Sequence, residues 1–202
     1  MAIATRGQSP IALAQDDYWA LIQDAVDDRT ISTPDQLDIT WKYPSQWGQG
    51  FVRNIYLREG LVLSIADYCP CEDLVLTSAD REHPLELTYI LVGAELSDLM
   101  PFQAGQHTFC GSGMAPSSVQ TKLANRRNVD VSIHIEPALF GQWMTGNVDQ
   151  LPDPVTRLVK PSDQTFYAQI STTTATMQMA VQQILQCPFQ GLTQRMYLES
   201  KV

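Results

Sequence analysis

The stretch that decides the fold reads Val129-Asp130-Val131-Ser132-Ile133-His134-Ile135. Apolar and polar residues alternate along it, so the four apolar side chains share one face of an extended chain and the polar ones share the other. This alternation predicts a β-strand that is buried on one side only. We expect its polar face, which carries His134 and is continued by Glu136, to be solvated. Pro137 ends the strand because it cannot donate to the ladder, and it opens a short helix through Met144.

The same period of two recurs upstream of this stretch. Turns that contain Gly, Pro or paired Asn residues separate the alternating segments, as loops between neighbouring strands do. The predicted strands comprise residues 51–57, 61–68, 74–77, 85–92 and 105–110. Many short strands at regular spacing favour a double-sheet sandwich or barrel.

Helices are predicted at the two ends of the chain. Apolar residues at helical spacing between Ile11 and Val26 predict an N-terminal helix, and Asp16 and Asp17 suit its first turn because they face the positive end of the helix dipole. The chain is therefore divided into residues 1–40 for an N-terminal helix and linker, 41–145 for the barrel, and 146–202 for a connector and helices.

The last segment, residues 177–202, predicts two helices joined by a break. An apolar stripe at helical spacing runs to Leu185. Cys187-Pro188-Phe189-Gln190-Gly191 then interrupts the pattern, because Pro188 disfavours helix in the residue before it and the glycine permits a turn. A second apolar stripe begins at Leu192 and has no stop signal at its end, so we expect this helix to lead into a further segment.

A family resemblance is carried by residues 177–201, which read MQMAVQQILQCPFQGLTQRMYLESK. They resemble the end of the sensor half of AraC-type transcription regulators, in the branch that includes the pyochelin-responsive regulator. The likeness covers roughly residues 40–202 and includes PSQWGQG (44–50), LREGL (57–61) and VSIHIEP (131–137). It implies a mainly β, α+β fold with helices at the ends: a cupin-like β-barrel followed by an antiparallel helical pair. It also implies a DNA-binding helix-turn-helix domain, which is absent from this chain.

The resemblance further implies a second copy of the chain and a small-molecule effector as partners. An apolar helical face needs a partner, so we expect a homodimer through the C-terminal helices. The candidate dimerisation residues are Leu185, Leu192, Met196 and Tyr197. The expected effector is a ferric siderophore, and aromatic surface suits a flat ligand. The candidate ligand-binding residues are Trp41, Tyr43, Trp47 and His107.

Composition limits where and how the protein works. The formal net charge is −9, from 13 basic and 22 acidic side chains, which argues against nucleic-acid binding by this chain alone. DNA contact is thus expected only through the missing domain. No apolar run is long enough to cross a membrane, and the N-terminus lacks the pattern of a signal peptide, so we expect a cytoplasmic protein.

Four cysteines are the main candidates for a metal centre. They are Cys69, Cys71, Cys110 and Cys187. Thiols of a cytoplasmic protein are expected to be reduced, so metal binding or redox sensing competes with simple burial. The set could hold an iron–sulfur cluster or zinc, with His107 as an alternative fourth ligand in place of Cys187. Such a cluster would make the chain a redox or iron sensor, and this alternative stays open beside the siderophore sensor.

The histidines argue against a metal-dependent enzyme of cupin type. Such a site needs about three imidazole or carboxylate ligands around one metal with an open position. The chain has only three histidines, His83, His107 and His134, and His83 sits beside a proline in a predicted turn. We therefore expect no enzymatic activity, with a cupin enzyme as the less favoured alternative.

Overall fold

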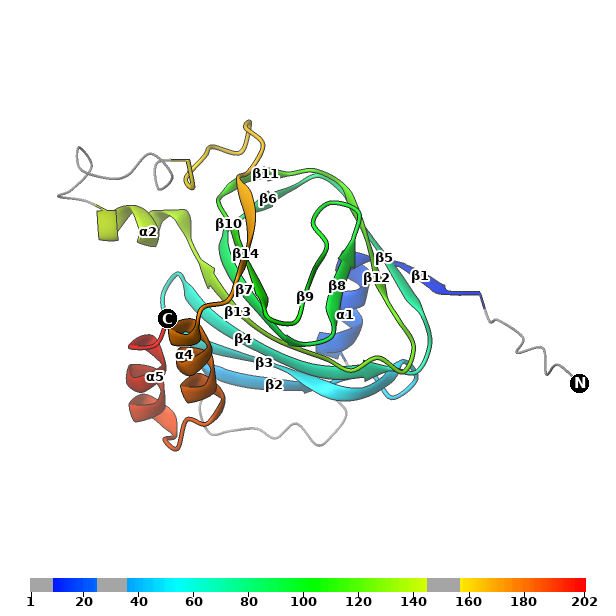
Figure 1. Cartoon of the computed structure of the whole chain (residues 1–202), viewed down its shortest axis with the longest axis horizontal. Coiled ribbons are helices and arrows are strands. Elements are labelled where there is room, and N and C mark those ends of the chain that lie inside the picture. The colour runs from blue at the N-terminus through cyan, green and yellow to red at the C-terminus, as the bar shows by residue number, and fades with distance from the viewer. Residues whose placement is uncertain (1–8, 25–35, 145–156) are drawn as a thin grey trace, which may run out of the picture.

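A computed structural model describes residues 9–24, 36–144 and 157–202 of the chain (Figure 1). Two β-sheets face each other, and helices lie at one end of the pair and on the outer face of the larger sheet (Figure 1). The space between the sheets is a hollow that residues of both sheets line. We call the two sheets and the hollow the barrel, although separate ladders, not one closed ladder, form it. The predicted fold class, mainly β with helices at the ends, is confirmed.

The larger sheet has seven strands. Their spatial order is β14 (Ala168–Thr172), β10 (Gln106–Cys110), β7 (Leu85–Val92), β13 (Asn128–Ile135), β4 (Leu61–Pro70), β3 (Gly48–Arg58) and β2 (Asp38–Lys42). All six neighbouring pairs are antiparallel. Strand β14 comes from the segment predicted as connector and helices, and it extends the sheet beside β10.

The smaller sheet has five strands and faces the first across the hollow. Its order is β1 (Ile11–Ala14), β5 (Leu74–Ser78), β12 (Ser118–Lys122), β8 (Ala94–Ser97) and β9 (Phe102–Gln103). A two-stranded ribbon joins β6 (Arg81–His83) to β11 (Gly113–Ala115). The helices are α1 (Gln15–Asp24), α2 (Pro137–Met144), α4 (Ala175–Leu185) and α5 (Gly191–Glu199). In the part of the chain that the structure describes, no helix has the length and apolarity that crossing a membrane requires.

Strand β13 lies at the centre of the large sheet, between β4 and β7. Its apolar residues Val131 and Ile133 are buried in a cluster that also contains residues of α4 and α5. Its polar residues instead line the hollow. The predicted solvated face is confirmed at Glu136, which is exposed, but was wrong at Ser132, which is buried. The alternation of a strand tells which side chains share a face but not what covers that face.

The N-terminal segment differs from its prediction. The structure has strand β1, paired in parallel with β5, before α1 begins at Gln15. The Ile11 N–H donates to the Asp73 carbonyl at 2.9 Å, so the edge of β5 provides backbone partners that a helix would not use. Helix α1 then buries Tyr18 and Ile22 in a cluster with Trp47 and its neighbours, which places α1 at one end of the barrel.

The C-terminal helices form as predicted. The Thr174 hydroxyl caps α4 by accepting a hydrogen bond from the Met177 N–H at 3.3 Å. Gly191 adopts a left-handed φ of 59° where α5 starts, as the break requires. Val181 and Ile184 of α4 and Leu198 of α5 pack into the cluster on the outer face of the large sheet.

Candidate ligand site inside the barrel

A cavity of about 500 Å³ lies between the two sheets. Strands β3, β4, β7 and β13 of the large sheet line one wall, and β5, β8 and β12 of the small sheet line the other, with α1 at one end. Its size falls in the range of sites for small organic molecules. Charged side chains project into it in two groups, which we call the Lys122 group and the Glu86 group.

The Lys122 group consists of Lys122, Tyr68, Glu95 and Asp130. The ammonium of Lys122 donates to the Tyr68 hydroxyl at 2.6 Å and lies 4.8 Å from the centre of that ring. Glu95 accepts a hydrogen bond from the Gln120 amide. The Asp130 carboxylate faces the same cavity from β13 and has no hydrogen bond or ion pair within the described ranges.

The Lys122 group contains one basic side chain and two acidic ones, and burial shifts the pKa values of the acids. Burial raises the pKa of Asp130 to about 7, because the ionised form loses its hydration, and Lys122 only partly offsets this. Burial likewise raises the pKa of Glu95. Burial works against the charge of Lys122, yet its pKa is raised by Tyr18, Glu95 and Asp130 around it. Lys122 therefore stays charged at neutral pH, while the two carboxyl groups compete for one cation.

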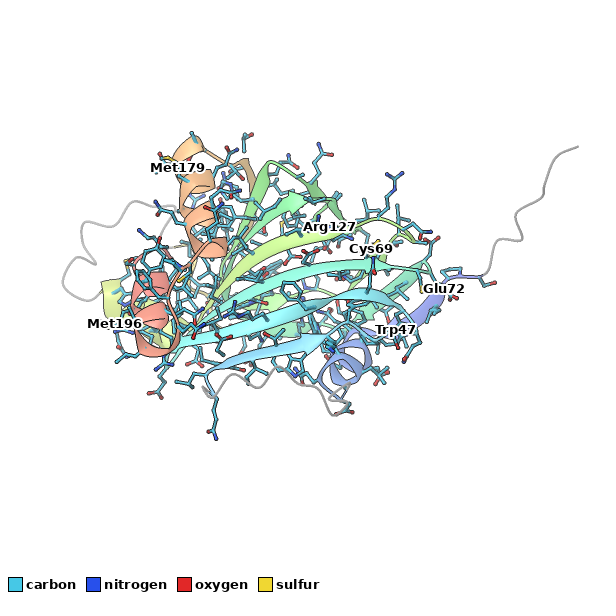
Figure 2. The ribbon with its side chains drawn as sticks, turned by 90° about the horizontal axis from the view of Figure 1, so that it is seen from below. Trp47, Cys69, Glu72, Arg127, Met179 and Met196 are labelled. Atoms are coloured by element: carbon cyan, nitrogen blue, oxygen red, sulfur yellow. The ribbon has the colours of Figure 1, made fainter. Side chains whose placement is uncertain are left out.

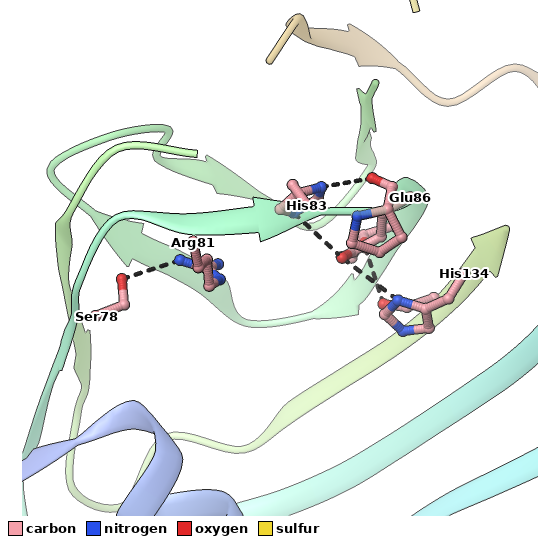
Figure 3. A network of polar contacts seen from close by, with 8 residues as sticks. Ser78, Arg81, His83, Glu86 and His134 are labelled. Atoms are coloured by element: carbon pink, nitrogen blue, oxygen red, sulfur yellow. Dashed lines mark hydrogen bonds and ion pairs between the residues drawn. The ribbon is translucent and has the colours of Figure 1, made fainter. Parts of the chain in front are cut away.

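The Glu86 group consists of Glu86, His83 and His134 (Figure 3). One oxygen of Glu86 lies 3.6 Å from His83 Nε2 and 3.5 Å from His134 Nδ1. The other accepts a hydrogen bond from Thr88 Oγ1 at 2.7 Å, and Thr88 in turn lies 2.8 Å from the Ser132 hydroxyl. Burial alone would raise the pKa of Glu86, but the nearby imidazoles of His134 and His83 lower it overall, so this carboxylate is ionised.

The tautomer of His83 follows from its contact with the main chain. Its Nδ1 lies 2.6 Å from the Pro84 carbonyl oxygen, which can only accept, so Nδ1 carries the proton. Nε2 faces the Glu86 carboxylate oxygen at 3.6 Å, so a proton on Nε2 points at an acceptor.

The four cysteines are not brought together. Cys110 lines the cavity, whereas Cys187 packs on the outer-face cluster beneath the helices. Cys71 is exposed and donates its thiol to the Gln46 carbonyl at 3.5 Å. Cys69, two residues earlier in the sequence, lies in β4 (Figure 2). Burial raises the pKa of Cys110 to about 12, which keeps it a thiol.

Metal binding thus has no geometric support in the described ranges. They contain no group of three or more His, Cys, Asp or Glu side chains placed to hold a metal ion. The large sheet separates Cys110 from Cys187, a separation that thiol count and spacing along the chain could not reveal. The predicted cysteine-bound cluster or zinc stays a prediction.

The predicted ligand-binding residues lie elsewhere. Tyr43 and Trp47 are buried in the cluster around α1, with Trp41 packed against it. His107 is buried with its ring centre 5.5 Å from that of Tyr89, and burial lowers its pKa. None of the four is among the residues that line the cavity.

Only one feature of the sequence could have predicted residues that line the cavity. Asp130, Ser132 and His134 share a strand face, and three polar side chains in register on a central strand are compatible with a polar interior as well as with solvent. Lys122 and Glu95 left no comparable signal, because only the facing of the two sheets brings them to Asp130.

The predicted dimerisation residues are mostly exposed. The exposed fraction is 66% for both Leu192 and Met196 and 39% for Leu185. Met179, in α4, adds a further exposed apolar side chain (Figure 2). Tyr197 instead packs partly into the outer-face cluster, with its ring centre 5.2 Å from that of Phe189. We call the exposed set Met179, Leu185, Leu192 and Met196 the apolar helix surface.

Comparison with known proteins gives one family match. The family model described as the regulatory protein PchR N-terminal domain matches residues 47–202. No curated protein resembles the chain significantly.

Solved structures similar to the chain include proteins of cupin fold. A putative glyoxylate-induced protein from Pseudomonas aeruginosa is 14% identical, with a TM-score of 0.37 over 72% of this chain and 52% of that one. A single-residue variant of the oxalate decarboxylase of Bacillus subtilis is 13% identical, with a TM-score of 0.30 over 67% and 44%. Hazelnut (Corylus avellana) vicilin is 13% identical, with a TM-score of 0.34 over 50% and 32%. The chain spans about a third to a half of the length of these proteins.

Proposed function

Because the chain belongs to the family of PchR-type regulatory N-terminal domains, we propose that it is the effector-sensing and dimerisation domain of an AraC-type transcription regulator. The observation that carries the proposal is the cavity of about 500 Å³ between the two sheets, which charged and aromatic side chains line. In this proposal the effector is a small molecule linked to iron status, with a ferric siderophore as the expected class. The protein acts in the cytoplasm by binding and has no enzymatic activity of its own.

The large sheet provides a route from cavity to helices. Alternate residues of β13 line the cavity and pack against α4 and α5, so a single layer of backbone separates the two. A ligand that pushes Ser132 or Asp130 shifts the strand that carries Val131 and Ile133, and with it the support of the helices. In this scheme the signal is a bias between two arrangements of the helical pair.

A polar contact fixes α5 to the edge of the same sheet. Arg53 of β3 forms a two-pronged ion pair with the buried Asp38 of β2, at 2.8 and 2.6 Å. With the Gln194 amide oriented to satisfy both partners, it donates to Asp38 at 3.1 Å and accepts from Arg53 at 2.9 Å. Gln194 is buried in α5, so its hydrogen bonds link α5 to both β2 and β3.

In this proposal dimerisation uses the apolar helix surface, and DNA contact belongs to a helix-turn-helix domain outside this chain. The net charge of −9 supports that division of labour, because an acidic domain is repelled by DNA phosphates.

Filling the cavity tests the proposal. Ala66 is buried and lines the cavity, so Ala66→Leu places three carbon atoms in the ligand space, whereas Ala138→Leu adds the same atoms to an exposed position of α2. Binding of ferric pyochelin is followed by tryptophan fluorescence, since Trp19 lines the cavity. We expect wild type and Ala138→Leu to bind and Ala66→Leu to lose affinity by about tenfold or more. Circular dichroism checks that Ala66→Leu remains folded at the temperature of the titration. Equal affinity of the three proteins would contradict a cavity site.

A further inference from the structure

The cavity carries a charge imbalance that indicates the chemistry of its ligand, provided that the cavity is the effector site as proposed. In the Lys122 group two carboxyl groups, Glu95 and Asp130, face one ammonium, Lys122. Among the described residues, no ion pair within 4 Å joins these three side chains, so they surround the space without closing it. A carboxylate removed from water is costly unless a donor or a cation reaches it.

Asp130 is the side chain that lacks such a partner. Lys122 is already engaged by the Tyr68 hydroxyl and lies 5.7 Å from the centre of the Tyr18 ring. Glu95 has the Gln120 amide. In the described part of the chain, Asp130 lines the cavity and is half-buried, yet it has neither a hydrogen bond nor an ion pair.

A second, independent polar atom is also without a partner within the described ranges. The side-chain oxygen of Asn54, a cavity-lining residue of β3, is buried and accepts no hydrogen bond there. Two acceptors that line the cavity from the large sheet, Asp130 and Asn54, are therefore without a donor among the described residues, which favours a ligand that donates.

We propose that the effector bound in this cavity carries a protonated amino group, which sits between Asp130 and Glu95, and an apolar part, which lies against the aromatic side chains of the cavity. The ammonium supplies the donors and the positive charge that the site lacks. Tyr18, Trp19 and Phe102 line the same cavity and offer the apolar and aromatic surface that the rest of such a ligand needs.

An anionic ligand fits the same site less well. Lys122 is the cation that would attract it, but two carboxyl groups already face this ammonium, and their field holds its proton more firmly. An added anion would meet net repulsion from Asp130 and Glu95, and would leave both without a partner. Comparing the affinities of a matched amine and acid therefore decides whether the site prefers a positively or a negatively charged ligand.

Three probes of similar size and different charge test the proposal: phenethylamine, 2-phenylethanol and 3-phenylpropionate. Their binding at pH 8 is followed by tryptophan fluorescence and calorimetry. We expect saturable millimolar binding of phenethylamine and affinities about tenfold lower for the alcohol and the acid. Tighter binding of 3-phenylpropionate, or no saturation by phenethylamine up to about 20 mM, overturns the proposal.

Two variants locate the amine. Asp130→Asn keeps the shape and removes the charge, and we expect it to weaken phenethylamine binding by about tenfold. Asp163→Asn makes the same change at an exposed position and should bind as wild type does. Equal binding by both variants would place the amine elsewhere and refute the proposal.

The pH dependence gives a further readout. Asp130 is faced by Lys122 of β12, Glu95 of β8, Glu86 of β7 and Tyr68 of β4. Its pKa of about 7 means that it gains negative charge from pH 6 to 8. Amine affinity should therefore rise over this interval, whereas a fall would overturn the proposal.

The failure of this inference and the failure of the proposed function can be told apart. Tighter binding of the acid than of the amine would reject only the amine as the ligand class. Unchanged ferric pyochelin binding by Ala66→Leu would instead reject the cavity as effector site.

Discussion

The ionisation of Asp130 couples the stability of the barrel to pH. Its pKa is about 7 in the folded protein and near 4 in an unfolded chain. A raised pKa means that the folded state binds the proton more tightly, so this contribution to stability is complete below pH 4 and is lost as the pH rises to 7. The loss amounts to up to about 4 kcal/mol for a shift of this size.

Asp130→Asn should remove that pH-dependent loss. The amide cannot ionise, so we expect the variant to have a higher free energy of unfolding than wild type at pH 8 and a similar one at pH 4. Urea unfolding of both proteins at the two pH values measures the difference. Asp163→Asn is the matched control and should follow wild type throughout. A variant that is less stable than wild type at pH 8 would show that the Asp130 charge stabilises the fold.

The same residue shows what sequence reasoning could reach. The alternation in β13 correctly sorted Asp130, Ser132 and His134 onto one face and Val131 and Ile133 onto the other. It could not tell that a second sheet covers the polar face and that two helices cover the apolar one. Burial by a distant segment depends on topology, and a local pattern carries no information about it.

Among the connecting elements, the break between α4 and α5 depends on one glycine. Gly191 has a φ of 59°, and a Cβ placed there would meet nothing within 4 Å. The cost of a side chain is therefore in the backbone alone, and we expect Gly191→Ala to lower the free energy of unfolding by about 1 kcal/mol. Thermal and urea unfolding provide the measurement.

Gly141, inside α2, is the control for this change. A Cβ there also meets nothing within 4 Å, but the residue lies in a helix. Gly141→Ala should therefore raise stability by up to about 1 kcal/mol, so that one substitution has opposite signs at two sites. If Gly191→Ala were neutral, the left-handed turn would not be required. If it also left the effector response unchanged, the break would have no part in coupling.

The N-terminal segment shows where element prediction stops. Residues 11–14 fit the apolar stripe of a helix, and they form a strand because β5 offers an open edge nearby. Helix α1 begins one residue later, and Asp16 and Asp17 occupy its first turn as predicted. Local periodicity thus located the helix correctly. At its N-terminal end, however, β1 pairs with a strand about sixty residues away, and this pairing determines the local structure there.

At the scale of the whole molecule, the large sheet is a partition with different chemistry on its two sides. One side faces charged groups in the cavity, and the other carries the helices whose apolar surface remains exposed. Exposed side chains as large as Leu192 and Met196 on a paired helix are typical of a surface that another protein covers. We propose a second copy as that partner, since a closed dimer buries the same surface of both chains.

Leu192→Glu tests this dimer without disturbing the fold. Leu192 is 66% exposed and lies in the first turn of α5, where an acidic residue interacts favourably with the helix dipole. Two copies of the new charge would meet across a two-fold interface and repel one another, so we expect the dimer to dissociate in analytical ultracentrifugation while Tm changes little. Thr193→Glu places the same charge in the same turn on another face of α5 and should leave the dimer intact. A Leu192→Glu protein that remained dimeric would exclude this surface as the interface.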